Sequence, residues 1–384
     1  MPDSAVSSNA TTWNRYLLPA FTFMSVVIGG GYATGRELVE FFMPSGPVGG
    51  LLGMLVCALL WSAIFALSLE LARSTQSFDY RAFFRQLLGR GWVLFEVAYL
   101  ALMFLILAVL GAASGEIASD ILHTPSWTGV VAFLGFIALL SWLGTAAIES
   151  FFSIWGMVLI VTYIVFILVC ISAFGERIGA GFEAASVPGE GWLRGGVMYA
   201  GYNVAIVPAL LFCARHQQRR REALIAGALA GPIAILPGVV LYIAMLARYP
   251  EIREAPIPLQ VLLHALDVPW LAIGMQIAIF GTLVQTGVGV LQGFNERLLG
   301  ARARSAEKGA RNLRLVSALA IAGVAILLAT RVGLIDLIAR GYGYLAWVML
   351  AIYAVPLATV GVWRIWMCRS APGSGSAPER NQFL

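Results

Sequence analysis

About ten apolar runs, each long enough to cross a lipid bilayer, follow one another along this chain. A membrane-spanning helix needs roughly 20 mostly apolar residues, and clusters of Arg, Pro and Gly separate the runs. Hydrophobic residues make up 60% of the 384 positions and charged residues only 12%, which is outside the range of soluble globular proteins. The sequence therefore predicts an all-α polytopic membrane protein.

Ten transmembrane helices are predicted within one membrane domain, residues 13-369. The short tails at 1-12 and 370-384 are expected to be disordered, because they have too few apolar residues to form a core. The predicted spans are 15-43, 47-71, 92-118, 127-143, 149-174, 192-213, 222-247, 269-299, 312-330 and 342-366.

The positive charges predict an orientation, because basic loops are retained in the cytoplasm. With the N-terminus inside, 18 of the 25 Lys and Arg residues fall on the cytoplasmic side. An even number of spans then places both termini in the cytoplasm, and we expect a bacterial inner membrane. The net charge of +5 follows from this retention and does not indicate a nucleic-acid partner. The expected partners are the lipid bilayer and a small solute.

Glycines interrupt the first and sixth predicted spans at corresponding positions. The ten helices divide into two sets of five, roughly 13-174 and 190-366, and an odd number of spans per set inverts the second set in the membrane. The sequence therefore predicts a 5+5 inverted repeat with broken helices 1 and 6. The first span contains VVIGGGYATGRELVEFF with Gly29, Gly30, Gly31 and Gly35, and the sixth contains RGGVMYAGYNVAIVP with Gly195, Gly196, Gly201 and Pro208.

A break inside the bilayer frees backbone N–H and C=O groups that lipid cannot satisfy, so such breaks occur where protein, water, an ion or a substrate satisfies them. The half-helix that starts near Thr34 is expected to present its positive end to an anionic group, and the carbonyls at 28-30 suit a cation. The alternative is close helix packing, because Gly31 and Gly35 also form a GxxxG spacing.

The motif GGGYATGRELVEFF resembles the first helix of the YkvI-like family of bacterial membrane proteins, which carries a GAGFASGQE-type motif. AGYNVAIVPALL at 200-211 and QTGVGVLQGFNER at 285-297 resemble the sixth and eighth helices of that family. The family is grouped with the amino acid-polyamine-organocation superfamily. The resemblance therefore implies the LeuT-type fold and a permease function.

Candidate substrate-binding residues flank the two breaks. In the first turn of the outer half-helix, a carboxylate at Glu37 can hold a substrate ammonium, take up a proton, or offset the helix dipole. Arg36 and Glu40, four residues apart, are expected to pair. Beside the second break, an aromatic ring with a polar group suits a gate over a solute. The residues predicted to bind substrate are Gly29, Gly30, Gly31, Tyr32, Thr34, Glu37, Tyr199, Gly201, Tyr202 and Asn203.

A candidate Na⁺ site comprises Ile28, Gly31, Thr282 and Thr286. The two threonines lie four apart on the eighth span, and the superfamily architecture implies that this helix packs beside the first break. The alternative is that each hydroxyl bonds to a carbonyl of its own helix. The fifth predicted span contains no lysine that would replace the ion with a fixed ammonium.

Several function classes are disfavoured. The chain's only lysine, Lys308, lacks a GxxxxGK context, and no GxSxG or HExxH motif is present, so neither an ATP-driven pump nor an enzyme is expected. No cofactor is expected beyond a coupling Na⁺ or H⁺. We expect a secondary active transporter for an amino acid or related compound, working by alternating access. The alternative is a non-transporting, nutrient-sensing receptor subunit on the same fold.

Overall fold

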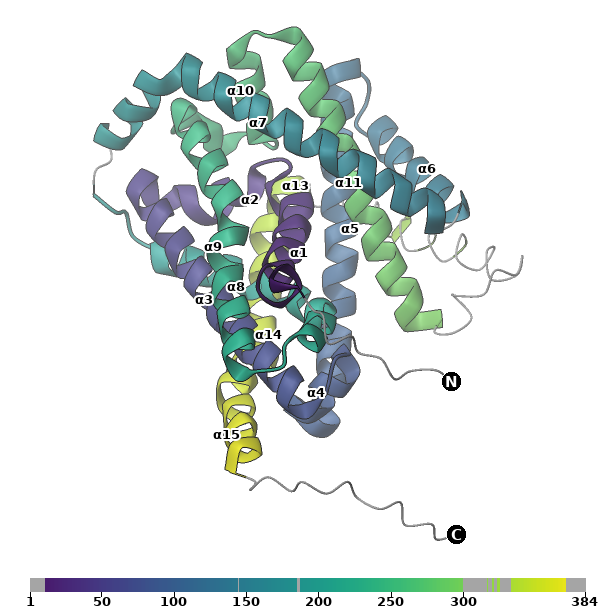
Figure 1. Ribbon diagram of the computed structural model, residues 1–384. Coiled ribbons are helices and arrows are strands. Elements are labelled where there is room, and N and C mark those ends of the chain that lie inside the picture. The colour runs from purple at the N-terminus through teal and green to yellow at the C-terminus, as the bar shows by residue number, and fades with distance from the viewer. Residues whose placement is uncertain are drawn as a thin grey trace.

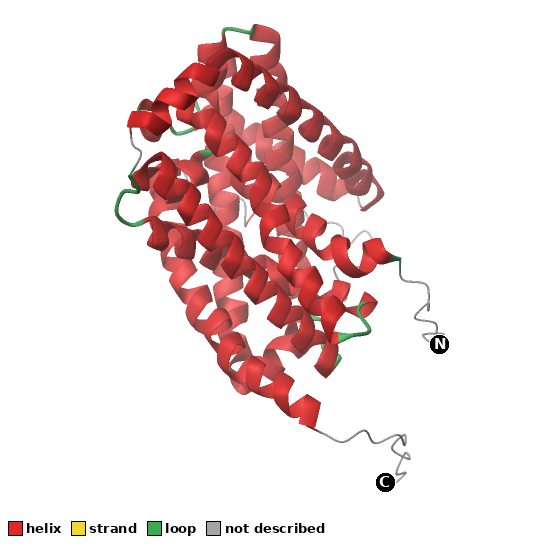
Figure 2. Cartoon of the chain, turned by 60° about the vertical axis from the view of Figure 1, so that its left-hand side comes forward, coloured by secondary structure: helices red, strands yellow, loops and turns green. Residues whose placement is uncertain are grey.

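The computed structural model describes residues 11–143, 145–184, 187–299 and 333–370, together with residues 316, 320, 323 and 324. Within these residues the chain is built from helices, and none of them forms a strand (Figure 2). The predicted all-α fold class is therefore confirmed. The disordered tails and the predicted span 312-330 fall almost wholly outside the described residues.

The first half of the chain forms an interrupted first span followed by further helices, which Figure 1 shows from purple to blue-teal. The first span is split into several pieces, whereas the others are continuous α-helices. The pieces of the first span are η1 (Trp13–Leu17), α1 (Leu18–Val27), η2 (Ile28–Tyr32) and α2 (Arg36–Phe42). The elements that follow in the first half are η3 (Met43–Ser45), α3 (Gly46–Thr75), α4 (Tyr80–Leu88), η4 (Gly89–Gly91), α5 (Trp92–Leu122), α6 (Trp127–Leu143) and α7 (Thr145–Ala184).

The second half begins again with an interrupted span. Its elements are α8 (Trp192–Asn203), η5 (Val204–His216), α9 (Arg220–Met245), η6 (Leu246–Arg248), η7 (Glu251–Glu254), α10 (Pro258–Leu266), α11 (Pro269–Leu299), α13 (Leu334–Asp336), η9 (Leu337–Tyr342), α14 (Gly343–Met349), η10 (Leu350–Ala354), η11 (Leu357–Gly361) and α15 (Val362–Ser370). The helix α10 was not among the predicted spans.

Seven helical runs among the described residues are long and apolar enough to cross a membrane, and α6 is a shorter apolar helix. The protein is therefore a multi-pass membrane protein. Most predicted span edges are close to the observed ones, but α7 continues to Ala184, well past the predicted end at 174. Many large apolar side chains of α7 are exposed, as expected where a helix faces lipid.

The helices pack as two sets. In the first set, α3 packs on α9 and α8, and α1 packs on α9; in the second set, α11 packs on α7, α5 and α6. The first set contains the first two spans of each half of the chain, which is the relation that an inverted repeat predicts.

Small residues bring α9 against α3. A Cβ added at Gly231 would lie 2.0 Å from the carbonyl oxygen of Ala58, and one added at Gly227 would lie 2.2 Å from the amide nitrogen of Ala66. Backbone atoms cannot move aside as a flexible side chain can, so these glycines set the separation of the two helices.

We predict that Gly231→Ala destabilises the protein, because one methyl group would push α9 away from α3. Overpacking of this kind costs about 1–3 kcal/mol. The measurement is the melting temperature of the purified protein in detergent. Gly274→Ala on α11 is the control, because an added Cβ there meets no atom within 4 Å. Equal melting temperatures for the two variants would contradict this account of the packing.

The first span is broken, but not at the three consecutive glycines. Residues 28–32 stay helical as the π-helical segment η2, and the helix is lost at residues 33–35. Gly35 has φ +75°, a left-handed conformation that L residues rarely adopt, and α2 begins at the next residue. The predicted break in this span is confirmed, and its position is shifted toward Gly35.

The sixth span is interrupted after Asn203, where the α-helix α8 gives way to the 3₁₀ helix η5. The glycines predicted to mark this break lie inside α8 and serve packing instead. A Cβ added at Gly195 would lie 2.0 Å from the carbonyl oxygen of Phe41, and one added at Gly201 would lie 3.0 Å from that of Ala346. Their small size permits close contact with other helices, so the expectation that they interrupt the helix was wrong.

Candidate functional site

Glu37 is a buried acid at the centre of the first set of helices. It lies in the first turn of α2, is 2% exposed, and accepts a hydrogen bond from the Tyr202 hydroxyl on α8. Among the described residues no Lys, Arg or His nitrogen lies within the 4.0 Å of a salt bridge from its carboxylate. A buried carboxyl group without a cationic partner is costly to keep, so Glu37 is the strongest functional candidate in the structure.

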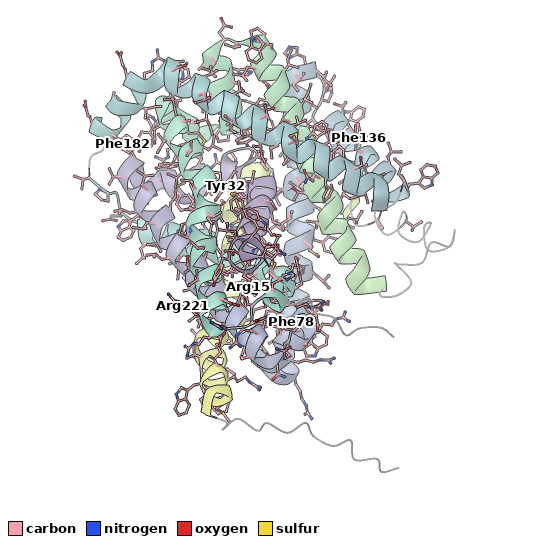
Figure 3. The ribbon with its side chains drawn as sticks, viewed as in Figure 1. Arg15, Tyr32, Phe78, Phe136, Phe182 and Arg221 are labelled. Carbon is pink, nitrogen blue, oxygen red and sulfur yellow. The ribbon has the colours of Figure 1, made fainter. Side chains whose placement is uncertain are left out.

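Four tyrosines surround Glu37, and we call Tyr32, Tyr199, Tyr202 and Tyr342 the tyrosine cluster. The ring centroids of Tyr202 and Tyr342 lie 4.5 Å apart and those of Tyr199 and Tyr202 lie 5.5 Å apart. All four side chains are buried, and Figure 3 shows Tyr32 near the middle of the molecule. Tyr342 begins the last predicted span but was not predicted as a site residue.

The hydroxyls of the tyrosine cluster differ in their hydrogen-bond partners. Tyr32 donates to the carbonyl oxygen of Ala234 at 3.1 Å, and Tyr202 donates to Glu37. The Tyr199 hydroxyl is buried and has no hydrogen-bond partner among the described residues. The cluster therefore places a hydroxyl with spare hydrogen-bonding capacity close to the buried acid, as in a site that binds a ligand.

Other predicted substrate residues lie at the two interruptions. The Asn203 amide donates to the carbonyl of Tyr199 at 3.0 Å, within its own helix. The Thr34 hydroxyl accepts from the backbone N–H of Arg36 at 3.2 Å and so caps the start of α2. This cap, together with Glu37 in the first turn, already complements the positive end of the half-helix. A substrate carboxylate would compete with both groups there.

The carbonyls of residues 32–34, at the break in the first span, are all bonded within the protein. The carbonyl of Tyr32 accepts from the Gly35 N–H at 3.1 Å and from the Tyr163 hydroxyl at 3.0 Å. The carbonyl of Ala33 accepts from the same hydroxyl at 3.0 Å, and that of Thr34 accepts from the Leu259 N–H at 3.3 Å. Tyr163 was not predicted as a site residue, although a lone tyrosine inside an apolar span is a signal that could have indicated it.

The eighth predicted span packs beside the first span, as expected for the candidate Na⁺ site, but no ion site is established. An added Cβ at Gly29 would lie 2.9 Å from the hydroxyl oxygen of Thr286 and 3.9 Å from the methyl carbon of Thr282, so η2 lies against α11. The Thr282 hydroxyl donates to the carbonyl of Ala278 on its own helix at 2.8 Å. Na⁺ ligation by Ile28, Gly31, Thr282 and Thr286 stays a prediction.

Arg36 fastens α2 to the connection that follows α9. Its Nη1 donates to the carbonyls of Arg253 and Ala255 at 2.7 and 3.1 Å, and its Nη2 pairs with Glu40 at 2.5 Å. The predicted Arg36–Glu40 pair is therefore confirmed. A cavity of about 640 Å³ opens here; it is lined by Arg36, Val39, Glu40, Pro44, Pro250, Glu251, Arg253 and Glu254. Glu37 and the tyrosine cluster do not line it, so the site is closed at this end.

We predict that Tyr202→Phe destabilises the protein by about 1–3 kcal/mol, because Glu37 loses a hydrogen-bond donor in a buried site. The measurement is the melting temperature in detergent. Tyr344→Phe is the control, because Tyr344 is 74% exposed on α14.

Adding Glu37→Leu distinguishes a specific bond from general packing. Its cost should be smaller in the Tyr202→Phe background than in the unmodified protein, because both polar partners are then removed together. Strictly additive effects would contradict a direct bond between the two side chains.

The comparisons with known proteins agree with this structure. No family model matches the chain. It is 22% identical over 288 residues to the uncharacterized membrane protein YkvI of Bacillus subtilis (strain 168), covering 73% of this chain and 80% of that protein. The resemblance to YkvI drawn from the sequence is confirmed.

Two solved structures share the fold. MhsT in complex with L-phenylalanine matches with a TM-score of 0.58 at 14% identity, over 94% of this chain and 98% of that one. The manganese transporter of Eremococcus coleocola matches with a TM-score of 0.59 at 15% identity, over 92% and 80% of the two chains. The LeuT-type fold is confirmed.

Proposed function

We propose that this chain, a relative of YkvI with the LeuT-type fold, is a secondary active transporter for a small solute that carries a protonated amine. An amino acid is the first candidate. The transport is coupled to Na⁺ or H⁺ and works by alternating access. The observation that carries the proposal is Glu37, a buried carboxyl group beside the interruptions of two spans, with no cationic partner among the residues that the structure describes.

The chemistry around Glu37 suits an ammonium group. A carboxylate forms charge-assisted hydrogen bonds with an amine, and tyrosine rings attract a cation over their faces. The free hydroxyl of Tyr199 adds an oxygen that can accept from the same group. An amine would supply the positive charge that none of the described residues places beside Glu37.

The fold by itself does not select the solute. One structural neighbour is described in complex with L-phenylalanine and another as a manganese transporter. The preference for an amine therefore rests on the residues at the site, and the neighbours support only the transporter fold.

Alternating access has a structural basis in the two sets of helices. The first set carries both interrupted spans, and the second set packs mainly within itself. Opening the site toward the 640 Å³ cavity requires the bonds of Arg36 to the Arg253 and Ala255 carbonyls to break. Rocking of the first set against the second then exposes Glu37 to one side at a time.

We place the protein in a bacterial cytoplasmic membrane with both termini inside. The loops predicted to be cytoplasmic do meet at one end of the molecule. Arg15 pairs with Glu222 at 3.3 Å, and Arg73 donates to the carbonyl of Gln218 at 3.3 Å. Figure 3 shows Arg15 and Arg221 in the same lower part of the view as Phe78. A shared basic end supports the orientation that the charge bias predicts.

The test is uptake of a mixed amino-acid pool into proteoliposomes under an imposed Na⁺ or H⁺ gradient. We expect accumulation of at least one amino acid against its gradient, and a loss of at least about tenfold with Glu37→Gln, because removing a buried charged contact costs a few kcal/mol. Glu251→Gln is the control, because its side chain is 74% exposed at the cavity rim.

Two results would contradict the proposal. One is no gradient-driven accumulation of any amino acid, and the other is unchanged uptake by Glu37→Gln. Binding of a solute without accumulation would instead favour the receptor subunit.

A further inference from the structure

The break in the first span is held by a side chain from a distant helix. Tyr163 lies near the middle of α7, 131 positions along the chain from Tyr32. Its hydroxyl donates to the carbonyl oxygens of Tyr32 and Ala33, each at 3.0 Å. A single phenol proton is thus shared between two backbone oxygens that the lost helical turn left without their usual partners.

Two converging carbonyl oxygens at an interrupted membrane helix are also the ligands that Na⁺ takes in transporters. The Tyr163 hydroxyl satisfies the same lone pairs, but it is covalently fixed and carries no charge. It therefore cannot follow an ion gradient across the membrane. While the hydroxyl donates to these oxygens, a cation would have to displace it to bind them both.

Further oxygen atoms lie on the helix that packs against the same segment. The same π-helical segment lies against α11, where Thr286 lies close to Gly29. The Thr282 hydroxyl donates to its own helix and so keeps its oxygen lone pairs available as an acceptor. Carbonyl and hydroxyl oxygens are the ligand types that hard cations prefer.

We infer that the Tyr163 hydroxyl takes the place of a coupling Na⁺ at the break in the first span. Solute movement is then independent of Na⁺, and removing the hydroxyl turns the carbonyl pair into a Na⁺ site. The statement about coupling rests on the proposed transport function. Of the two coupling ions proposed there, Na⁺ and H⁺, it selects H⁺. The statement about Na⁺ binding does not depend on transport.

The test uses Na⁺ itself as the probe. Melting temperatures of the purified protein are measured in sodium, potassium and choline chloride at equal ionic strength, for the unmodified chain and for Tyr163→Phe. We expect no difference between the salts for the unmodified chain. Tyr163→Phe should melt several degrees lower in choline chloride and recover most of that loss in sodium chloride, because a ligand that binds only the folded state stabilises it.

Tyr242→Phe is the matched control for a purely structural role. Tyr242 is another buried phenol that donates to two carbonyls, those of Gly46 and Pro47, but away from the break. Its loss should lower the melting temperature equally in all three salts. Adding Thr286→Val to Tyr163→Phe should remove the Na⁺ response if the α11 hydroxyl completes the site.

Three outcomes would overturn the inference: selective stabilisation of the unmodified chain by Na⁺, no Na⁺ response of Tyr163→Phe, or the same response from Tyr242→Phe. If Tyr163→Phe does not fold, the unmodified chain still decides, because uptake driven by a Na⁺ gradient contradicts the inference. Such uptake would leave the transporter proposal standing, whereas absent uptake without Na⁺ stabilisation would sink only the transporter proposal.

Discussion

A peptide group inside lipid must find a hydrogen-bond partner, and the centre of this protein is organised by that requirement. The first span gives up its helical bonding at residues 33–35. The Gly35 N–H, a phenol from α7 and a backbone amide of α10 each supply a partner for the released carbonyls. The interruption is thus stabilised by segments from both halves of the chain, and it ties the first set of helices to the second at one point.

The same interruption explains why an acid can be buried here. The break turns the chain so that α2 starts again with Glu37 facing the tyrosines of α8 and η9. A continuous helix would lack the new N-terminal turn, whose free N–H groups favour a nearby carboxylate. The backbone irregularity and the buried acid therefore depend on each other, and the tyrosine cluster closes around both.

The sequence was enough to predict the spans, the broken first helix and the Arg36–Glu40 pair, because apolar length and helical spacing are local properties. It could not distinguish packing glycines from helix-breaking ones. Gly195 and Gly201 lie against backbone of Phe41 and Ala346, and those partners are known only from the tertiary structure. The role of Tyr163 was hidden for the same reason, since its acceptors lie far away along the chain. The helix α10 was missed because it is short, although Pro258 at its start is a recognised signal.

Arg36 and Glu37 are neighbours in the chain and point to different places. The Arg36 guanidinium donates to carbonyls of the connection after α9, whereas the Glu37 carboxyl group accepts from the Tyr202 hydroxyl. The two side chains leave the same turn of α2, which has only seven residues. Any tilt that pulls the arginine from its carbonyls also shifts the acid relative to the tyrosines. The contact of α2 with the connection after α9 and its contact with the tyrosine cluster are therefore coupled through a single turn of helix.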